Sequence, residues 1–206
     1  VRGDYQHQNG DGISPTTVAA DTVTPAFAAN FATRLNGLIP RLDATDSYSL
    51  RQISVGRLRD KQAGVSSDLS LALGDTTVRL ISGFRDWRNE QSEDDIVLTQ
   101  AALFGRDASY RSTSHSEELQ IITPEGERFT AVGGLYYFRE HYDVDTTLNL
   151  GADFCNIYVR NTAPARVAAC LAGPQRGGGR SQFGQITESY AAYGQATFKI
   201  TPDWDI

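Results

Sequence analysis

The chain has 206 residues, with 19 Gly, nine Tyr, nine Phe, no Met and a formal net charge of -6. An acidic chain lacks the basic stripe of nucleic-acid-binding proteins, which excludes that class. No apolar run approaches the roughly 18 residues of a membrane-spanning helix. With no initiator Met and a strand-like pattern at its start, the sequence is expected to be an internal piece of a longer protein, in which a signal peptide would not be visible.

The N-terminal quarter of the sequence is mostly polar and predicts one helix. Residues 1–8 have the pattern of a strand end, and 9–12 supply turn residues. A helix is predicted over 25–39, where Pro25 suits the first helical position. Its apolar stripe consists of Phe27, Phe31, Leu35 and Leu38 or Ile39. Such stripes usually seek a partner surface, which favours a short helix packed on its own loop over an amphipathic lid that contacts a ligand.

A pair of strands is predicted after a charged, weakly periodic region in which 48–57 is expected to be extended. Leucine recurs at every second position from Leu69 to Leu73, which is the period of a strand. The pair at 74–75 makes a very short turn. The second strand has Val78 and Leu80 on one face and Arg79 on the other. Beyond it, loops are expected over 89–95 and 96–112.

A hairpin is predicted over 113–143. In its first strand Leu119 and Ile121 alternate with Glu118 and Gln120, and the turn residues of 124–127 follow. The second strand, 129–138, is apolar and aromatic apart from one threonine. After this hairpin we expect a long connection over 145–180, a last strand over 185–200 and a turn at 201–203.

The order of short and long connections predicts an antiparallel meander. The turns at 74–75, 124–127 and 201–203 are short, whereas the connections after Asn9, Asn89 and Tyr142 are long. A transmembrane β-barrel has this rhythm, with its short turns at the periplasmic end and its long loops at the extracellular end. The expected fold class is therefore all-β.

Aromatic residues recur near strand ends at a spacing that suits a lipid band. Phe129 and Tyr137 share one strand face, as do Tyr190 and Phe198. Eight residues at about 3.3 Å each and tilted by about 45° span about 20 Å, near the ~25 Å apolar band of a barrel. These four are the candidates for lipid-facing aromatic girdles. Alternation alone does not separate this reading from a soluble sandwich, whose polar residues would face water.

Three segments resemble recurring strands of TonB-dependent outer-membrane receptors. They are HSEELQIITPEGERFTAVGGLYYFRE (115–140), SYAAYGQATF (189–198) and LISGFRD (80–86), together about a fifth of the chain. The resemblance implies a 22-stranded barrel with a plug domain, integral to the bacterial outer membrane and in contact with lipid. It implies uptake of a scarce ligand such as an iron siderophore, haem, cobalamin or a glycan fragment. It also implies an inner-membrane energising complex of the TonB type as partner.

The sequence departs from that family pattern in what it lacks. The plug domain, the N-terminal coupling box and the closing C-terminal strand are not in it, so 1–206 is expected to be roughly six to seven strands of the barrel domain. On such a wall the inward, lumen-facing candidates are Arg79, Arg85, Glu118, Gln120, Gln195 and Lys199.

No catalytic residue, cofactor or metal site is predicted. In a strand His115 and Glu117 share a face while Glu118 points away, so the three do not converge on a metal. The acidic residues of 143–149 lack the spacing of a calcium loop. Cys155 and Cys170 suit a local disulfide in an oxidising compartment, although two free thiols fit the same spacing.

Two other kinds of protein are also compatible with the sequence. A porin or autotransporter barrel shares every physical feature above and is disfavoured only by the resemblance. A soluble carbohydrate-binding β-sandwich would place one set of apolar residues in a protein core: Leu69, Leu71, Val78, Leu80, Leu119 and Ile121. An enzyme is the weakest of the alternatives, because no Ser, His and Asp set has supporting motif context.

Overall fold

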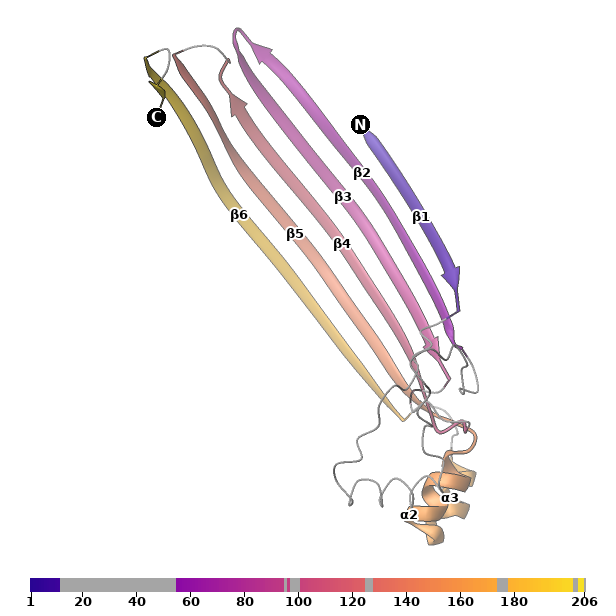
Figure 1. The fold of residues 1–206 in the computed structure, drawn as a ribbon. Coiled ribbons are helices and arrows are strands. Elements are labelled where there is room, and N and C mark those ends of the chain that lie inside the picture. Colours follow the sequence, from indigo (N-terminus) through magenta and orange to yellow (C-terminus); the bar gives the residue numbers. More distant parts are fainter. Residues whose placement is uncertain are drawn as a thin grey trace, which may run out of the picture.

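The structure is a computed structural model that describes residues 1–11, 55–94, 96, 101–124, 128–173, 178–201 and 204–205. These residues form one antiparallel sheet whose seven strands follow one another in chain order (Figure 1). The strands are β1 (Arg2–Gly10), β2 (Arg57–Leu73), β3 (Thr76–Glu93), β4 (Phe104–Ile122), β5 (Phe129–Leu150), β6 (Gly179–Thr201) and the short β7 (Trp204–Asp205). The prediction of an all-β antiparallel meander is confirmed. The helix predicted over 25–39 and nearly all of the segment 48–57 lie outside the described residues.

Short and long connections alternate as the sequence predicts, and they lie at opposite ends of the sheet. Strands β2 and β3 are joined by Gly74 and Asp75 alone, with Gly74 in the left-handed region at φ 63°. Only glycine adopts this φ without strain, so the two-residue turn depends on it. Figure 1 places the helical connection after β5 at the end opposite this turn.

The strands are longer than the sequence pattern indicates, which corrects five expected boundaries. Strand β2 begins at Arg57, well before the alternation that starts at Leu69, and β3 continues to Glu93 through the expected break at 89–95. Strand β4 begins at Phe104, inside the expected loop 96–112. Strand β5 continues to Leu150 and β6 begins at Gly179, so the expected connection 145–180 shrinks to 151–178.

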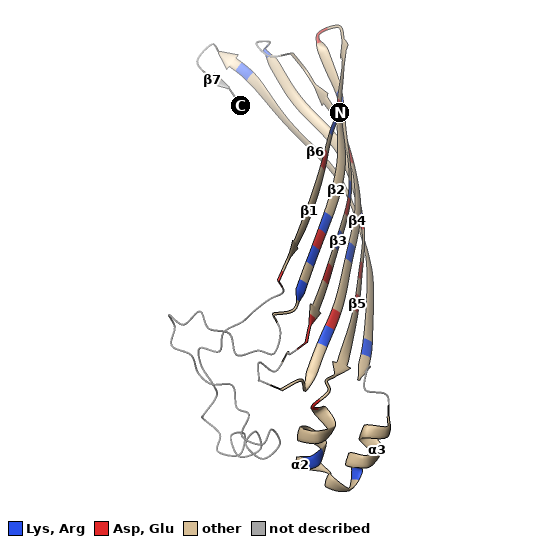
Figure 2. Ribbon diagram, turned by 90° about the vertical axis from the view of Figure 1, so that its right-hand side faces the viewer, with Lys and Arg blue, Asp and Glu red and all other residues tan. Residues whose placement is uncertain are grey.

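The sequence pattern underestimates the length of the strands for one physical reason. Most charged residues lie in the halves of the strands nearest the long connections (Figure 2). There both faces carry polar side chains, so the alternation that marks a strand disappears although the backbone ladder continues. Ion pairs join neighbouring strands instead, such as Arg59 with Glu90 and Arg106 with Glu93.

The sheet is a single layer over most of its length. In the described part of the chain the buried apolar residues all lie near the long connections: Ala101, Leu103, Ala108 and Cys155. Leu103 is fully buried and packs with Phe104, Ile157 and Tyr158. Among the described residues, Figures 1 and 2 show no second layer on either face of the strands.

The connection between β5 and β6 folds into short helical turns. These are η1 (Phe154–Val159), α2 (Arg160–Thr162), η2 (Pro164–Arg166) and α3 (Val167–Ala172). Cys155 and Cys170 form a disulfide that ties η1 to α3. Among the helices of the described residues, none is both long and apolar enough to cross a membrane.

Candidate functional surfaces

The register of the sheet sorts its side chains onto two faces. Successive residues of a strand point to opposite faces, and cross-strand partners share a face. All six residues that the sequence places on an inward face fall together on one face, here called the polar face: Arg79, Arg85, Glu118, Gln120, Gln195 and Lys199. The four aromatic candidates fall together on the other, here called the apolar face: Phe129, Tyr137, Tyr190 and Phe198.

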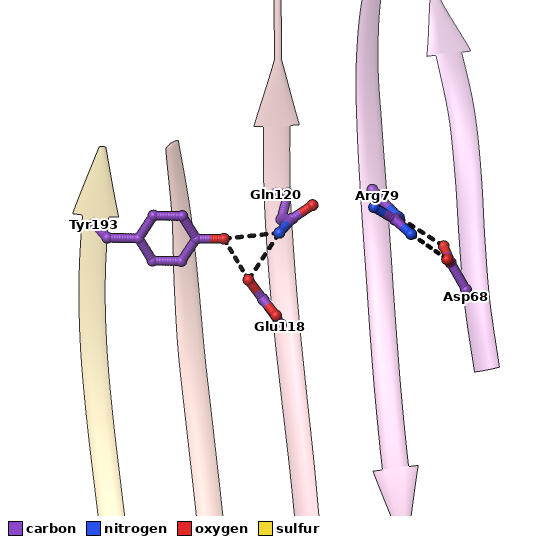
Figure 3. A network of polar contacts seen from close by, with 5 residues as sticks. All are labelled: Asp68, Arg79, Glu118, Gln120 and Tyr193. Atoms are coloured by element: carbon purple, nitrogen blue, oxygen red, sulfur yellow. Dashed lines mark hydrogen bonds and ion pairs between the residues drawn. The ribbon is translucent and has the colours of Figure 1, made fainter. Parts of the chain in front are cut away.

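A hydrogen-bonded cluster joins three strands on the polar face. The Tyr193 ring extends from β6 across β5, and its hydroxyl donates to the Glu118 carboxylate on β4 (Figure 3). The Gln120 amide donates to the same carboxylate at 2.8 Å and to the Tyr193 hydroxyl oxygen at 2.9 Å. The sequence alone gives no signal for Tyr193, because its contacts with Glu118 and Gln120 depend on the register of β4, β5 and β6.

Gly134 makes room for this cluster. It pairs with both Gln120 and Tyr193, so the ring crosses β5 directly above it. A Cβ at Gly134 would lie 2.6 Å from both Cζ and the hydroxyl oxygen of Tyr193. The glycine is therefore the gap that lets one side chain reach a strand two places away.

The same arrangement recurs at the β1 edge of the polar face. Arg85 on β3 reaches over Gly64 on β2 and donates to the Asp4 carboxylate on β1 at 3.1 and 3.3 Å. A Cβ at Gly64 would lie 2.8 Å from an Asp4 carboxylate oxygen. Between these two bridges Arg79 forms a bidentate pair with Asp68 on β2, with its Nε at 2.8 Å (Figure 3). Charge-assisted bridges thus link β3 to β1 and to β2, and hydrogen bonds link β4 to β6.

The apolar face carries two rows of aromatic side chains. Phe129 and Phe198 are direct cross-strand partners near the short turns, and Tyr137 and Tyr190 are partners eight residues farther along. The Tyr137 and Tyr190 ring centroids are 5.0 Å apart. Between the rows the face is aliphatic and exposed, including Leu71 at 60 %, Leu80 at 38 % and Leu135 at 60 %.

One carboxylate interrupts the apolar face. Glu117 accepts hydrogen bonds from the Ser82 hydroxyl on β3 and from His115 Nε2, the latter at 2.8 Å. His115 and Glu117 do share a face and Glu118 does point away, as the sequence predicts. In the described part of the chain no group of His, Cys, Asp and Glu has the arrangement of a metal site.

Beyond the tyrosine row the apolar face becomes charged. Arg180 on β6 donates to the Asp145 carboxylate from Nε at 2.9 Å and also from an Nη atom. The hydrogen bond from Arg180 holds the pKa of the Asp145 carboxyl below its ordinary value, against the upward effect of desolvation. Both residues line a shallow cleft of about 420 Å³ with Arg57, Glu90 and Asp107. The expected loop residues Asp145 and Asn149 are thus strand residues, and Asn149 donates to Asp107 at 2.6 Å.

An aromatic cluster anchors the disulfide-tied connection to the sheet. Phe104, Phe154 and Tyr158 lie with ring centroids 5.1 to 5.9 Å apart. The Asp153 carboxylate accepts a hydrogen bond from the Ala102 backbone at 3.0 Å, which joins this connection to the one before β4.

Comparison of the chain with protein-family models, with curated proteins and with solved structures found no match.

Proposed function

We propose that this chain forms part of the wall of an outer-membrane β-barrel, and that the barrel is a TonB-dependent receptor. The observation that carries the barrel is the exposed apolar face of a single-layer sheet. A soluble domain buries such a face against a second layer. A barrel wall needs no second layer, because lipid covers its outer face. Soluble monomers rarely leave contiguous apolar patches larger than a few hundred Å² to water.

The stagger of the short turns supports a closed, tilted wall. One ladder of cross-strand partners is Ala72, Thr77, Ile122, Val132 and Gln195. The first turn begins one residue beyond this ladder, after Leu73, and the third begins six residues beyond it, after Thr201. If all short turns lie at one membrane surface, five residues of shift over four strand intervals give a tilt of about 40°, at about 3.3 Å per residue and 4.8 Å per strand. Transmembrane barrels tilt by about 35–45°.

The aromatic rows lie at heights that suit the edges of lipid. At a tilt of about 40°, the eight residues between the phenylalanine and tyrosine rows correspond to about 20 Å along the membrane normal. This is close to the ~25 Å band that aromatic girdles border in such barrels. Phe129 and Phe198 would mark the periplasmic edge, and Tyr137 and Tyr190 the outer edge.

The length of the strands favours a receptor over a minimal barrel. Strands β3 to β6 have 18 to 23 residues, whereas about 9–11 residues cross a bilayer. The remaining halves would extend above the outer surface and raise the disulfide-tied connection well clear of the lipid. Loops held away from the membrane by a rigid wall are suited to capturing a ligand.

The assignment to the TonB-dependent class rests on the three resembling segments. It makes the whole protein a transporter that imports a scarce ligand, such as an iron siderophore, haem, cobalamin or a glycan fragment. An energising complex in the inner membrane would supply the work through parts of the receptor outside this sequence. Lumen-facing residues would be those of the polar face, with Glu118, Gln120 and Arg79 at the height of the lipid.

Fractionation of cells that express the complete protein tests the membrane assignment. The protein should sediment with outer membranes, resist extraction by carbonate and enter solution only with detergent. Recovery of folded protein in the detergent-free soluble fraction would contradict the barrel and favour the soluble β-sandwich.

Uptake measurements separate an energised receptor from a porin. Cells that express the protein should accumulate one ligand from a panel of iron chelates, haem, cobalamin and oligosaccharides. A protonophore should abolish accumulation but leave ligand binding at the cell surface intact. Equal uptake with and without the protonophore would favour a diffusion pore instead.

A loop replacement tests the assignment of ligand capture. Exchanging residues 151–178 for a short Gly-Ser turn keeps β5 and β6 intact, since both end outside this range. The exchange should weaken binding of the ligand found in the panel. Unchanged binding of every ligand would show that this connection takes no part in capture.

A further inference from the structure

Three cations stand side by side on the apolar face, beyond the tyrosine row. Lys61 on β2 pairs with Arg88 on β3, and Arg88 pairs with Arg111 on β4. Direct cross-strand partners have Cβ atoms about 4.5–5.5 Å apart, and like charges at this separation destabilise a sheet. A row of three such partners therefore has a cost that an anion outside the sheet would offset.

The carboxylates near this row do not neutralise it fully. Asp86 accepts from both Arg88, at 2.9 Å, and Arg111, at 3.3 Å, so one carboxylate serves two guanidinium groups. Asp143 is the next cross-strand partner after Arg111, but its carboxylate contacts His141 at 3.3 Å. Lys61 forms no ion pair with the described residues and is exposed.

The row is open to the surroundings of the sheet. The Arg88 and Arg111 side chains are 56 % and 53 % exposed. Guanidinium groups match the geometry of phosphate oxygens and form two parallel hydrogen bonds with them, while a lysine supplies a further point charge.

The height of the row of Lys61, Arg88 and Arg111 on the sheet indicates which phosphate-bearing molecule would reach it. Arg88 lies four residues beyond Phe84, which is on the same face and 46 % exposed. Four residues at about 3.3 Å each and a tilt of about 40° place Arg88 about 10 Å farther from the apolar band. The hydrocarbon core of a bilayer is about 30 Å thick within a total of about 40–45 Å, so this level is the headgroup layer.

We infer that Lys61, Arg88 and Arg111 form a binding site for the phosphate groups of an anionic membrane lipid, whose acyl chains lie on the apolar face below. The inference rests on the proposed membrane barrel. It gives the wall a site for bound lipid that is separate from the lumen and from the ligand-capturing loops.

Lipid binding to the complete protein tests this site. The protein is purified in a neutral detergent, and native mass spectrometry measures retention of phosphatidylglycerol against an uncharged galactolipid with the same acyl chains. Wild type should prefer the phosphate-bearing lipid. The variant K61Q/R88Q/R111Q should bind it about tenfold or more weakly, because several charge-assisted hydrogen bonds are lost. Its weak binding of the galactolipid should be unchanged.

A triple variant of the polar face, R2Q/R85Q/K199Q, provides the matched control. Arg2 pairs with Ser66 on β2 and therefore shares the polar face with Arg85 and Lys199. The variant removes the same charge from the opposite face and should keep wild-type lipid binding. Equal loss in both triple variants, or no loss in K61Q/R88Q/R111Q, would overturn the proposal. Complete competition by millimolar inorganic phosphate or by a phosphopeptide would also overturn it, in favour of a soluble anion.

Two further readouts keep the test independent of folding and of the barrel itself. Should K61Q/R88Q/R111Q fail to fold, the single variants R88Q and R111Q should each weaken retention severalfold, and wild-type retention in both would refute the site. Sedimentation of wild type with outer membranes reports on the barrel. A membrane-bound wild type with no preference for phosphate-bearing lipid would therefore reject the lipid site alone.

Discussion

Gly134 and Tyr193 form a coupled pair on the polar face. The substitution G134A places a Cβ where the ring now lies, so Tyr193 must move and its hydroxyl loses Glu118 and Gln120. We expect G134A to lower the free energy of unfolding by about 1–3 kcal/mol, since overpacking costs of that order. Urea unfolding of the complete protein in detergent micelles measures the change.

A double-mutant cycle distinguishes this coupling from a general intolerance of Ala at Gly134. In a Y193A background the ring is gone, and G134A should cost less than in wild type, because only the contact of its Cβ with the Leu119 carbonyl oxygen at 2.9 Å remains. The same cost in both backgrounds would mean that the ring is not what requires the glycine.

Asp145 and Arg180 give a pH-dependent contribution outside the lipid band. Because the hydrogen bond from Arg180 lowers the pKa of Asp145 in the folded state, the pair adds stability above the ordinary Asp pKa of about 3.9. That contribution disappears as the pH falls through the lowered pKa. In R180Q the pKa of Asp145 should rise towards its ordinary value. NMR titration of the labelled carboxyl carbon measures the shift, and an unchanged midpoint in R180Q would contradict this account.

At the scale of elements, the sequence predicts the half of each strand that alternates and misses the half that does not. From Leu69 to Leu73 and from Leu119 to Ile121 apolar and polar side chains alternate, and both stretches are strands. From Arg106 to Ser112 both faces are polar, and no local signal separates this strand from a loop. Its pairing with β3 and β5 decides the outcome, and these partners lie far away in the sequence.

The connection between β5 and β6 should depend on its disulfide. The bond closes a loop over a sequence separation of 15, for which chain entropy gives about 3 kcal/mol. We expect C155S/C170S to leave the sheet intact, because the bond lies outside the strands. Limited proteolysis should cut 151–178 much faster in this variant than in wild type, while heat-modified mobility on gels stays the same. Equal cutting rates would mean that the cluster of Phe104, Phe154 and Tyr158 suffices to hold the connection.

At the scale of the whole molecule, Ala191 and Ala192 offer a comparison of the two faces. They are neighbours in β6, Ala192 shares a face with Leu135, and Ala191 points to the polar face. In lipid, A192R should destabilise the protein by about 2 kcal/mol, whereas A191R should cost little on a lumen face. A192L should be neutral, because lipid imposes no fixed shape. Unfolding in micelles measures all three, and a cost of about 1–3 kcal/mol for A192L would indicate a packed protein core instead.

The assignment of faces was accessible from the sequence, and the contacts across them were not. Alternation suffices to group Arg79 with Arg85 and Phe129 with Tyr137. It does not tell that Arg85 reaches Asp4 or that Tyr193 reaches Glu118, because each contact skips a strand. Those contacts require the register of three strands at once, together with a glycine in the middle one.

The side chains that cross β5 and β2 also affect how the sheet resists sliding of one strand past its neighbours. A strand can slip past its neighbour by two residues and keep the same faces exposed. Such a slip of β5 would bring Val132 or Tyr136 beneath the Tyr193 ring in place of Gly134, and neither leaves space for it. Gly64 opposes a register shift of β2 in the same way, because a shift by two residues would bring Gln62 or Ser66 under Arg85. Each glycine thus leaves space for the crossing side chain in one strand register only. A force that pulls one strand along its axis is therefore passed to the strands on both sides.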